Sequence, residues 1–334
     1  MPTAISPTAY VPTTPEEVRN WGWSDLDVIL VTGDTYIDAP QIGAAVIARV
    51  LLAAGFRVGI IAQPDVVDGR DITRLGEPVL FWGVTGGSVD SMVANYTAAG
   101  RRRRSDDLTP GGRNTRRPDR AVLVYSHLIR RHFKKTRPIV LGGIEASLRR
   151  ISHYDAWNDA VRRSVLFDAK ADFLLYGMAD ETVVALATKL QAGQPPHTLR
   201  GLCYISPQPP PVDVEHWPGP DVTLPSHATV DTDPQAFARM FALFYANADP
   251  WRGRRLIQQQ DTRYLVQNPP APPPSPAVLD AVHELPYARA LHPFYAADGP
   301  VAALETIRFS LTTHRGCFGE CRFCAIAVHQ GRQV

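Results

Sequence analysis

Short apolar runs alternate with amphipathic stretches along the first 200 residues of the chain. Residues 27–32 read D-V-I-L-V-T and residues 57–62 read R-V-G-I-I-A. Such runs are typical of strands that are buried on both faces of a parallel sheet. Residues 42–54, between them, carry enough apolar side chains to predict a helix that packs on a sheet, and Gly55 follows as a helix terminator.

The same alternation continues downstream. We predict further strands at residues 77–84, 138–141 and 171–175, and helices near residues 89–99, 118–133, 144–151 and 180–192. Strands that alternate with helices favour a parallel sheet with right-handed crossovers. The predicted fold class is therefore α/β, with a Rossmann or flavodoxin-like domain over residues 1–205.

Proline changes the pattern after this domain. Residues 206–225 and 269–276 are proline-dense, which favours extended chain over regular structure. Asp233 lies between them, followed by a proline, and can cap a helix that we expect at about residues 234–248. We therefore interpret residues 206–300 as a Pro-rich connector that contains one clear helix.

The last segment, residues 301–334, has a different pattern. Residues 307–312 read I-R-F-S-L-T and alternate apolar with polar positions, which predicts a strand with one buried face. This strand leads directly into a cysteine-rich run. We expect the functional residues of the segment in this run.

Composition indicates an intracellular globular protein. The chain has 334 residues, 45% of them hydrophobic, and a net charge of +2, which indicates neither nucleic acid nor an anionic membrane as a partner. No apolar run reaches the roughly 18–20 residues of a membrane span. The N-terminus lacks the basic-then-apolar pattern of a signal peptide. We expect a cytoplasmic protein.

Three of the four cysteines, Cys317, Cys321 and Cys324, stand in the run R-G-C-F-G-E-C-R-F-C. Cysteine thiolates bind the iron corners of a 4Fe–4S cluster, normally four of them. Three thiolates leave one iron open, and an open position suits catalysis. Phe318 and Phe323 flank these ligands, and we expect them to exclude water from the cluster.

Two other interpretations of the cysteines were weighed. A ferredoxin needs a fourth cysteine, but Cys203 lies far upstream in L-C-Y-I, where we predict a buried apolar thiol in a strand. A structural zinc site needs four protein ligands, and His314 or His329 would supply the fourth. The C-x3-C-x2-C spacing and the preceding strand favour iron–sulfur.

This spacing, with an aromatic residue just before the third cysteine, resembles the signature of the radical SAM superfamily. Residues 313–326 read T-H-R-G-C-F-G-E-C-R-F-C-A-I and are followed by H-Q-G-R, which is similar to YgiQ-type radical SAM proteins. V-T-G-D-T-Y-I-D at 31–38, V-L-G-G-I-E-A-S-L-R-R at 140–150 and V-Q-N-P-P-A-P-P at 266–273 resemble the same family. The resemblance covers nearly the whole chain.

The resemblance implies a cofactor set and a reaction. Radical SAM enzymes use a 4Fe–4S cluster to cleave S-adenosylmethionine reductively to a 5′-deoxyadenosyl radical, which takes a hydrogen atom from the substrate. Cys317, Cys321 and Cys324 are then the metal ligands, and Phe323 packs near the adenine of S-adenosylmethionine. An electron donor such as a flavodoxin or a ferredoxin is the implied partner, and the substrate is unknown.

The resemblance also implies an architecture. A partial β/α barrel follows a domain that resembles a cobalamin-binding domain, and residues 301–334 contain only the first strand and the cluster loop. We interpret the chain as truncated and expect no catalysis by it alone. Cobalamin modules usually offer D-x-H-x-x-G, but residues 38–43 read D-A-P-Q-I-G and no histidine lies between residues 28 and 100. We therefore do not expect cobalamin.

Two alternative functions stay open. One is a non-catalytic metal-binding module with zinc or an electron-transfer cluster. The other is a stand-alone nucleotide- or cobalamin-binding domain, with its ligand at the carboxyl ends of the strands, where residues 32–38, 84–90 and 142–145 are expected.

Several basic residues were also interpreted. Residues 101–104, four arginines, are expected in an exposed loop. Arg149, Arg150 and His153 form a second basic group, with Arg162 and Arg163 expected near them on a helix. We interpret this group as a charged surface patch, and contact with an anion or a substrate carboxylate is the alternative.

Overall fold

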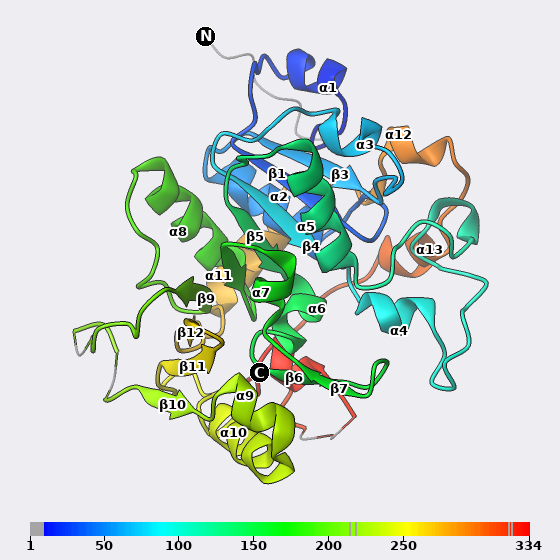
Figure 1. The fold of residues 1–334 in the computed structure, drawn as a ribbon. Coiled ribbons are helices and arrows are strands. Elements are labelled where there is room, and N and C mark those ends of the chain that lie inside the picture. The colour runs from blue at the N-terminus through cyan, green and yellow to red at the C-terminus, as the bar shows by residue number, and fades with distance from the viewer. Residues whose placement is uncertain (1–9, 214, 218, 320, 322) are drawn as a thin grey trace. The chain divides into compact units, whose positions relative to one another are not determined.

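The structure is a computed structural model that describes residues 10–213, 215–217, 219–319, 321 and 323–334 (Figure 1). The chain divides into two compact units, each built from two segments of sequence. Unit 1 comprises Met1–Ile139 and Pro274–Thr313, and unit 2 comprises Val140–Pro273 and His314–Val334. Both units combine helices with a sheet, which confirms the α/β fold class.

The sheet of unit 1 has the strand order β3-β1-β4. Its strands are β1 (Val28–Thr32), β3 (Val58–Ala62) and β4 (Phe81–Thr85), and β1 is parallel to both neighbours. Every residue of β1 and β3 is buried, which is why their sequences are continuous apolar runs rather than alternating ones. The predicted strands at 27–32 and 57–62 are confirmed.

Helices and a small strand pair complete unit 1. Helix α2 (Gly43–Ala53) packs on β1 and β3, and helix α5 (Ala121–His132) packs on β4. The remaining elements of this unit are α1 (Pro15–Asn20), β2 (Ile37–Asp38), α3 (Arg70–Thr73), α4 (Ser91–Asn95), the 3-10 helix Pro110–Gly112, α11 (Pro276–Glu284), β13 (Ala290–Leu291), α12 (Pro293–Ala296) and α13 (Ala303–Ile307). Strands β2 and β13 pair antiparallel.

The sheet of unit 2 is mixed. Its order is β5-β8-β9-β12-β11-β10, made of β5 (Ile139–Gly142), β8 (Phe173–Leu175), β9 (Leu202–Ser206), β12 (Arg263–Gln267), β11 (Leu256–Gln260) and β10 (Val222–Leu224). Strands β5 and β8 are parallel, as are β10 and β11. Strand β9 is antiparallel to both β8 and β12, and β12 is antiparallel to β11. The prediction of a purely parallel sheet was therefore too simple.

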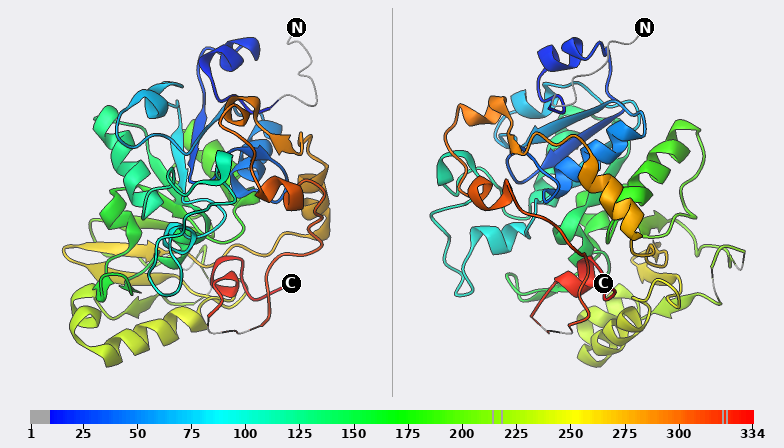
Figure 2. Two further views of the ribbon diagram at one scale, coloured as in Figure 1. Left: turned by 90° about the vertical axis from the view of Figure 1, so that its right-hand side faces the viewer. Right: turned by 180° about the vertical axis from the view of Figure 1, so that it is seen from behind.

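Helices of unit 2 surround this sheet, and α9 and α10 lie side by side (Figure 2). These helices are α6 (Gly143–Leu148), α7 (Val165–Ala169), α8 (Asp180–Gln191), α9 (His227–Thr232), α10 (Pro234–Ala246) and α14 (Ile326–His329). The predicted cap of α10 is confirmed, because the Asp233 side chain accepts a hydrogen bond from the Gln235 amide. Across the described part of the chain, every helix is too short or too polar to cross a bilayer.

Three sequence predictions were wrong. Residues 307–312 form no strand: Ile307 ends helix α13, and an alternating pattern needs a neighbouring strand to pair with, whereas Phe309 and Leu311 are 83% and 79% exposed. Arg162 lies in β7 (Ala160–Arg162), which pairs with β6 (His153–Asp155), rather than in a helix. Residues 206–300 are more than a connector, because they contain β10, β11 and β12.

Candidate functional site

The cysteine loop places two thiols around one glycine. A Cβ atom on Gly319 would lie 3.3 Å from Cys317 Sγ and 4.0 Å from Cys321 Sγ. The Cys324 amide donates a hydrogen bond to the Cys321 carbonyl over 3.0 Å, so a tight turn carries the third cysteine. Cys321 is exposed, and Cys317 and Cys324 are partly buried. A glycine at 319 is what leaves room between the first two sulfurs.

This loop fits an iron–sulfur cluster in its donors and in the space at Gly319. Thiolates are the usual ligands of such clusters. Among the residues that the structure describes, which omit Glu320 and Arg322, no three His, Cys, Asp or Glu side chains are grouped closely enough to hold a metal ion. The three thiols therefore have to come closer together when a metal group binds.

Phe318 and Phe323 do not shield the thiols in this structure. Their side chains are 80% and 93% exposed. The prediction that these two rings exclude water was wrong for the chain as it stands, because each ring points into solvent and nothing in the described chain covers it. Phe323 stays a candidate for contact with the adenine of S-adenosylmethionine, which its exposure permits.

The described residues of 314–334, which we call the cysteine segment, contact α6 of unit 2 through helix α14. His329 Nδ1 lies 2.9 Å from Ser147 Oγ in α6, the helix that follows β5. Arg315 forms an ion pair with Asp180, the first residue of α8, which follows β8. A Cβ atom on Gly177 would lie 3.5 Å from the His329 carbonyl oxygen. The segment therefore covers the carboxyl ends of β5 and β8.

The two ends of the cysteine segment also bind each other. The Gly316 amide donates to Gln330 Oε1 over 3.1 Å, and the Cys317 amide donates to the Gly331 carbonyl over 3.2 Å. Gly316 has φ +85°, and a Cβ there would come within 1.9 Å of the Gln333 carbonyl oxygen. A side chain cannot occupy that position, so glycine is required where the loop closes.

Arg150 lies directly under the cysteine segment and is only 3% exposed. Its Nε donates to Gln267 Oε1 over 3.1 Å, and its Nη1 donates to the Ser147 carbonyl over 2.6 Å. The guanidinium carbon lies 4.3 Å from the ring centroid of Tyr176 and 4.4 Å from that of Phe244. The predicted surface patch was wrong at this position, because Arg150 is buried between two aromatic rings.

The surroundings of Arg150 are low in polarity. Burial lowers the pKa of Arg150 itself. Burial, with a smaller effect of the Arg150 charge, lowers the pKa of His329 to about 4. Burial raises the pKa of Cys203 to about 12, and this thiol is fully buried in β9, which confirms the sequence prediction.

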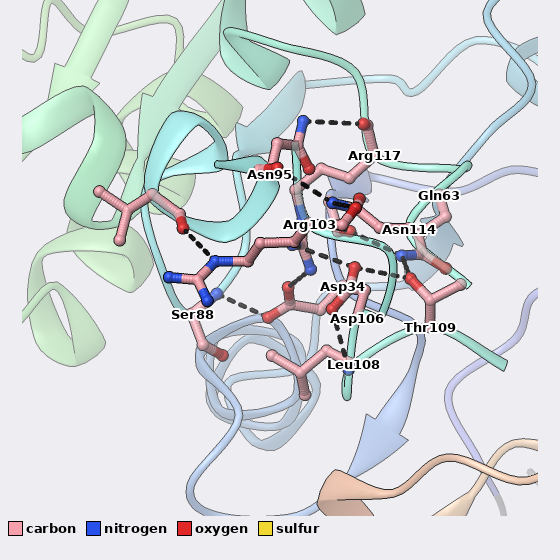
Figure 3. A network of polar contacts seen from close by, with 12 residues as sticks. Asp34, Gln63, Ser88, Asn95, Arg103, Asp106, Leu108, Thr109, Asn114 and Arg117 are labelled. Carbon is pink, nitrogen blue, oxygen red and sulfur yellow. Dashed lines mark hydrogen bonds and ion pairs between the residues drawn. The ribbon is translucent and has the colours of Figure 1, made fainter. Parts of the chain in front are cut away.

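The strand ends of unit 1 are closed by a different buried arginine (Figure 3). Arg117 is fully buried, its Nη2 lies 2.6 Å from Asp34 Oδ1, and its Nη1 lies 3.1 Å from Asp106 Oδ2. Arg117 Nε donates to the carbonyl of Gly33, the residue after β1, over 3.0 Å. The Ser88 amide donates to Asp34 Oδ2 over 2.6 Å.

Neutral side chains extend this network (Figure 3). Gln63, the residue after β3, donates through Nε2 to the Gly33 carbonyl over 3.0 Å and to Thr109 Oγ1 over 2.6 Å. Thr109 Oγ1 donates to Asp106 Oδ2 over 2.8 Å. Asp34 and Ser88 lie in the segments 32–38 and 84–90, where the alternative of a ligand-binding domain expects its ligand, and both are bonded to groups of the protein itself.

No sequence pattern indicated this role of Arg117. It stands in the run N-T-R-R-P, beside the exposed arginines 101–104. Only the fold shows that one arginine of this region is buried while the predicted arginine run is exposed.

Comparison with known proteins places the chain in a family. The family described as Radical SAM N-terminal matches residues 10–310. A UPF0313 protein of Fusobacterium nucleatum is 51% identical over 326 residues, which cover 97% of this chain and 56% of that protein. A UPF0313 protein of Thermotoga maritima is 50% identical over 328 residues, with the same coverage. The chain thus spans about half the length of these relatives.

Among solved structures, the radical S-adenosylmethionine methyltransferase TsrM from Kitasatospora setae is similar at a TM-score of 0.34 and 17% identity, over 53% of this chain and 28% of that one. The family match covers the motifs in residues 31–38, 140–150 and 266–273. The chain belongs to the Radical SAM N-terminal family, as its resemblance to YgiQ-type proteins predicted.

Proposed function

We propose that this chain is part of a radical SAM enzyme and that its cysteine loop binds a 4Fe–4S cluster. The observation that carries the proposal is the convergence of Cys317 and Cys321 on Gly319, in a chain of the Radical SAM N-terminal family. Cys324, on the turn that follows, supplies the third thiolate.

The cysteines, Phe323 and the residues that anchor the loop have different tasks in this proposal. Cys317, Cys321 and Cys324 hold the cluster, which when bound supplies the electron that cleaves S-adenosylmethionine to methionine and a 5′-deoxyadenosyl radical. Phe323 contacts the adenine, and its 93% exposure leaves the ring free to do so. Contacts of His329 with Ser147 and of Arg315 with Asp180 hold the loop on unit 2. The proposal names no substrate.

Anaerobic reconstitution with iron and sulfide tests this function. We expect about four irons per chain and an electron paramagnetic resonance spectrum of the reduced protein that shifts when S-adenosylmethionine is added. Serine variants of Cys317, Cys321 and Cys324 should each lose the cluster. Cys203→Ala is the matched control and should keep it, because Cys203 is buried in β9.

Two outcomes would contradict the proposal. Zinc bound without any cluster would leave a structural metal site. A cluster that ignores S-adenosylmethionine would leave an electron-transfer module. The proposal also includes a cytoplasmic electron donor such as a flavodoxin or a ferredoxin, and reduction of the reconstituted cluster by either protein would support that part.

A further inference from the structure

We propose that Arg150 is a positioning residue that holds the cysteine segment on the strand ends of unit 2. Its contacts link the segment to three elements of this unit, α6, β12 and α10, and to Tyr176, the residue after β8. Arg150 Nη1 lies 3.4 Å from the Val328 carbonyl oxygen in α14, and its other partners are Ser147, Gln267 and the rings of Tyr176 and Phe244. No other contact described for the segment joins so many elements at one side chain.

The charge of Arg150 explains why the contact matters. Within the described part of the chain, Arg150 has backbone carbonyls, an amide oxygen and two ring faces as partners, and none of its partners is a carboxylate. A buried cation without a counter-charge is unfavourable unless its hydrogen bonds are made. The Val328 carbonyl belongs to the last turn of α14, where backbone carbonyls have no hydrogen-bond donor within the helix. Arg150 and the segment therefore stabilise each other.

Arginine is the side chain that suits this position. Its planar fork donates in several fixed directions and its faces stack on aromatic rings. Lysine keeps the charge but has neither the fork nor the flat faces. Lysine at 150 should consequently hold the unit together while loosening the segment.

Hydrogen exchange measured by mass spectrometry on the cluster-free full chain tests the proposal. In Arg150→Gln, exchange in residues 314–334 should rise at least about tenfold, which corresponds to about 1.4 kcal/mol, while β5 and β8 keep their protection. Arg150→Lys should give a smaller rise in the same residues. Arg263→Gln is the matched control, an exposed arginine of β12 over Phe167, and should exchange like wild type.

Three results would overturn the proposal. The first is wild-type exchange of residues 314–334 in Arg150→Gln. The second is an equal rise in β5, β8 and the segment, which would make Arg150 an ordinary core residue. The third concerns Arg150→Lys, and failure of this variant to fold would overturn the proposal. If Arg150→Gln does not fold, wild-type exchange of residues 314–334 in a folded Arg150→Lys would overturn it as well.

Measuring the iron bound per chain distinguishes failure of this inference from failure of the proposed function. The role of Arg150 in the enzyme rests on that proposed function. Arg150→Gln should bind less iron per chain than wild type and Arg263→Gln. If wild type binds no cluster, the proposed function fails, and exchange still decides the role of Arg150. If wild type and Arg150→Gln bind iron equally and exchange equally, the function stands and the inference fails.

Discussion

Arg117 of unit 1 and Arg150 of unit 2 are both buried at strand ends, but their charges are compensated in different ways. Arg117 meets the carboxylates of Asp34 and Asp106. Arg150 meets carbonyl and amide oxygens and two aromatic rings, and one of those carbonyls comes from the cysteine segment. In unit 1 the strand ends are covered by residues from the first 120 positions, whereas in unit 2 they are covered by the cysteine segment, which follows residue 313.

The comparison shows that a position at the strand ends of an α/β sheet does not by itself determine what the residues there do. Such ends are where open sheets bind ligands, and a ligand at these ends was one of the alternative functions that the sequence left open. The ends of β1 and β4 are instead sealed by an ion-paired network, and the ends of β5 and β8 form the seat of the candidate cofactor loop. Four predictions can break or sharpen this contrast.

The largest effect is expected for Arg117→Met. Removing the arginine leaves the carboxyl groups of Asp34 and Asp106 buried without their cation, which costs about 3–5 kcal/mol of unfolding free energy. The neighbouring Arg116→Gln is the control, because its pair with Asp298 is partly exposed and should cost under about 1 kcal/mol. Urea denaturation measures both. Equal losses would mean that the network does not hold unit 1 together.

Gly87→Ala should come next. Gly87 has φ +108°, and an added Cβ would lie 2.2 Å from Asp34 Oδ1, so the carboxylate would have to move away from Arg117. We expect a loss of about 2–3 kcal/mol. Gly22→Ala has a comparable φ of +74° with open space around it and should lose about 1 kcal/mol. Thermal unfolding of both variants measures these losses, and the difference between them is the part that comes from the clash of the new Cβ with Asp34.

Acid should loosen the cysteine segment by a smaller amount. The pKa of His329 is about 4 in the folded chain and about 6.5 when unfolded. A lowered folded pKa means stabilisation that is full above about pH 6.5 and lost as pH falls toward 4. Between pH 7.5 and 5 we expect a loss on the order of 1 kcal/mol, given partial exposure.

Hydrogen exchange of residues 314–334, corrected for the intrinsic rate at each pH, measures this loss. His329→Gln is the control, since it keeps His153, whose pKa burial also lowers to about 4. The difference between wild type and His329→Gln isolates His329. A wild-type segment that is equally protected at both pH values would contradict the contact with Ser147.

The smallest effect is expected at the loop rings. Phe318→Ser and Phe323→Ser should change the unfolding free energy by less than about 0.5 kcal/mol, because both rings are exposed. Phe244→Ala, which removes a buried ring from the face of Arg150, should lose about 3–5 kcal/mol. A large loss at Phe323 would show that the loop ring is packed in solution.

The local pattern of apolar residues correctly predicted the strands whose two faces are both buried. Strands β1 and β3 are apolar along their whole length because both faces are covered, and Cys203 sits in such a run. Strand β11 reads L-I-Q-Q-Q, and its polar residues Gln258 and Gln260 are buried. Their amides bond to each other and to distant groups, so hydrophobicity gave no signal for that strand.

The same limit applies to the candidate site. The cysteines were recognised by their spacing alone, and the family match over residues 10–310 ends before them. Arg117 and Arg150 were missed because the burial of a charged side chain depends on partners far away in sequence: Asp34 is 83 residues from Arg117, and Val328 is 178 residues from Arg150. No short motif encodes such a pair.

The high pKa of Cys203 has a practical consequence for chemical labelling. With a pKa of about 12 and no exposed surface, this thiol carries almost no thiolate at neutral pH and is closed to reagents. Alkylating dyes added at pH 7 to 8 should therefore modify Cys317, Cys321 and Cys324 and leave Cys203 intact. The native chain carries three reporter groups in one loop, so the rate at which it takes up dye reports directly on how open that loop is.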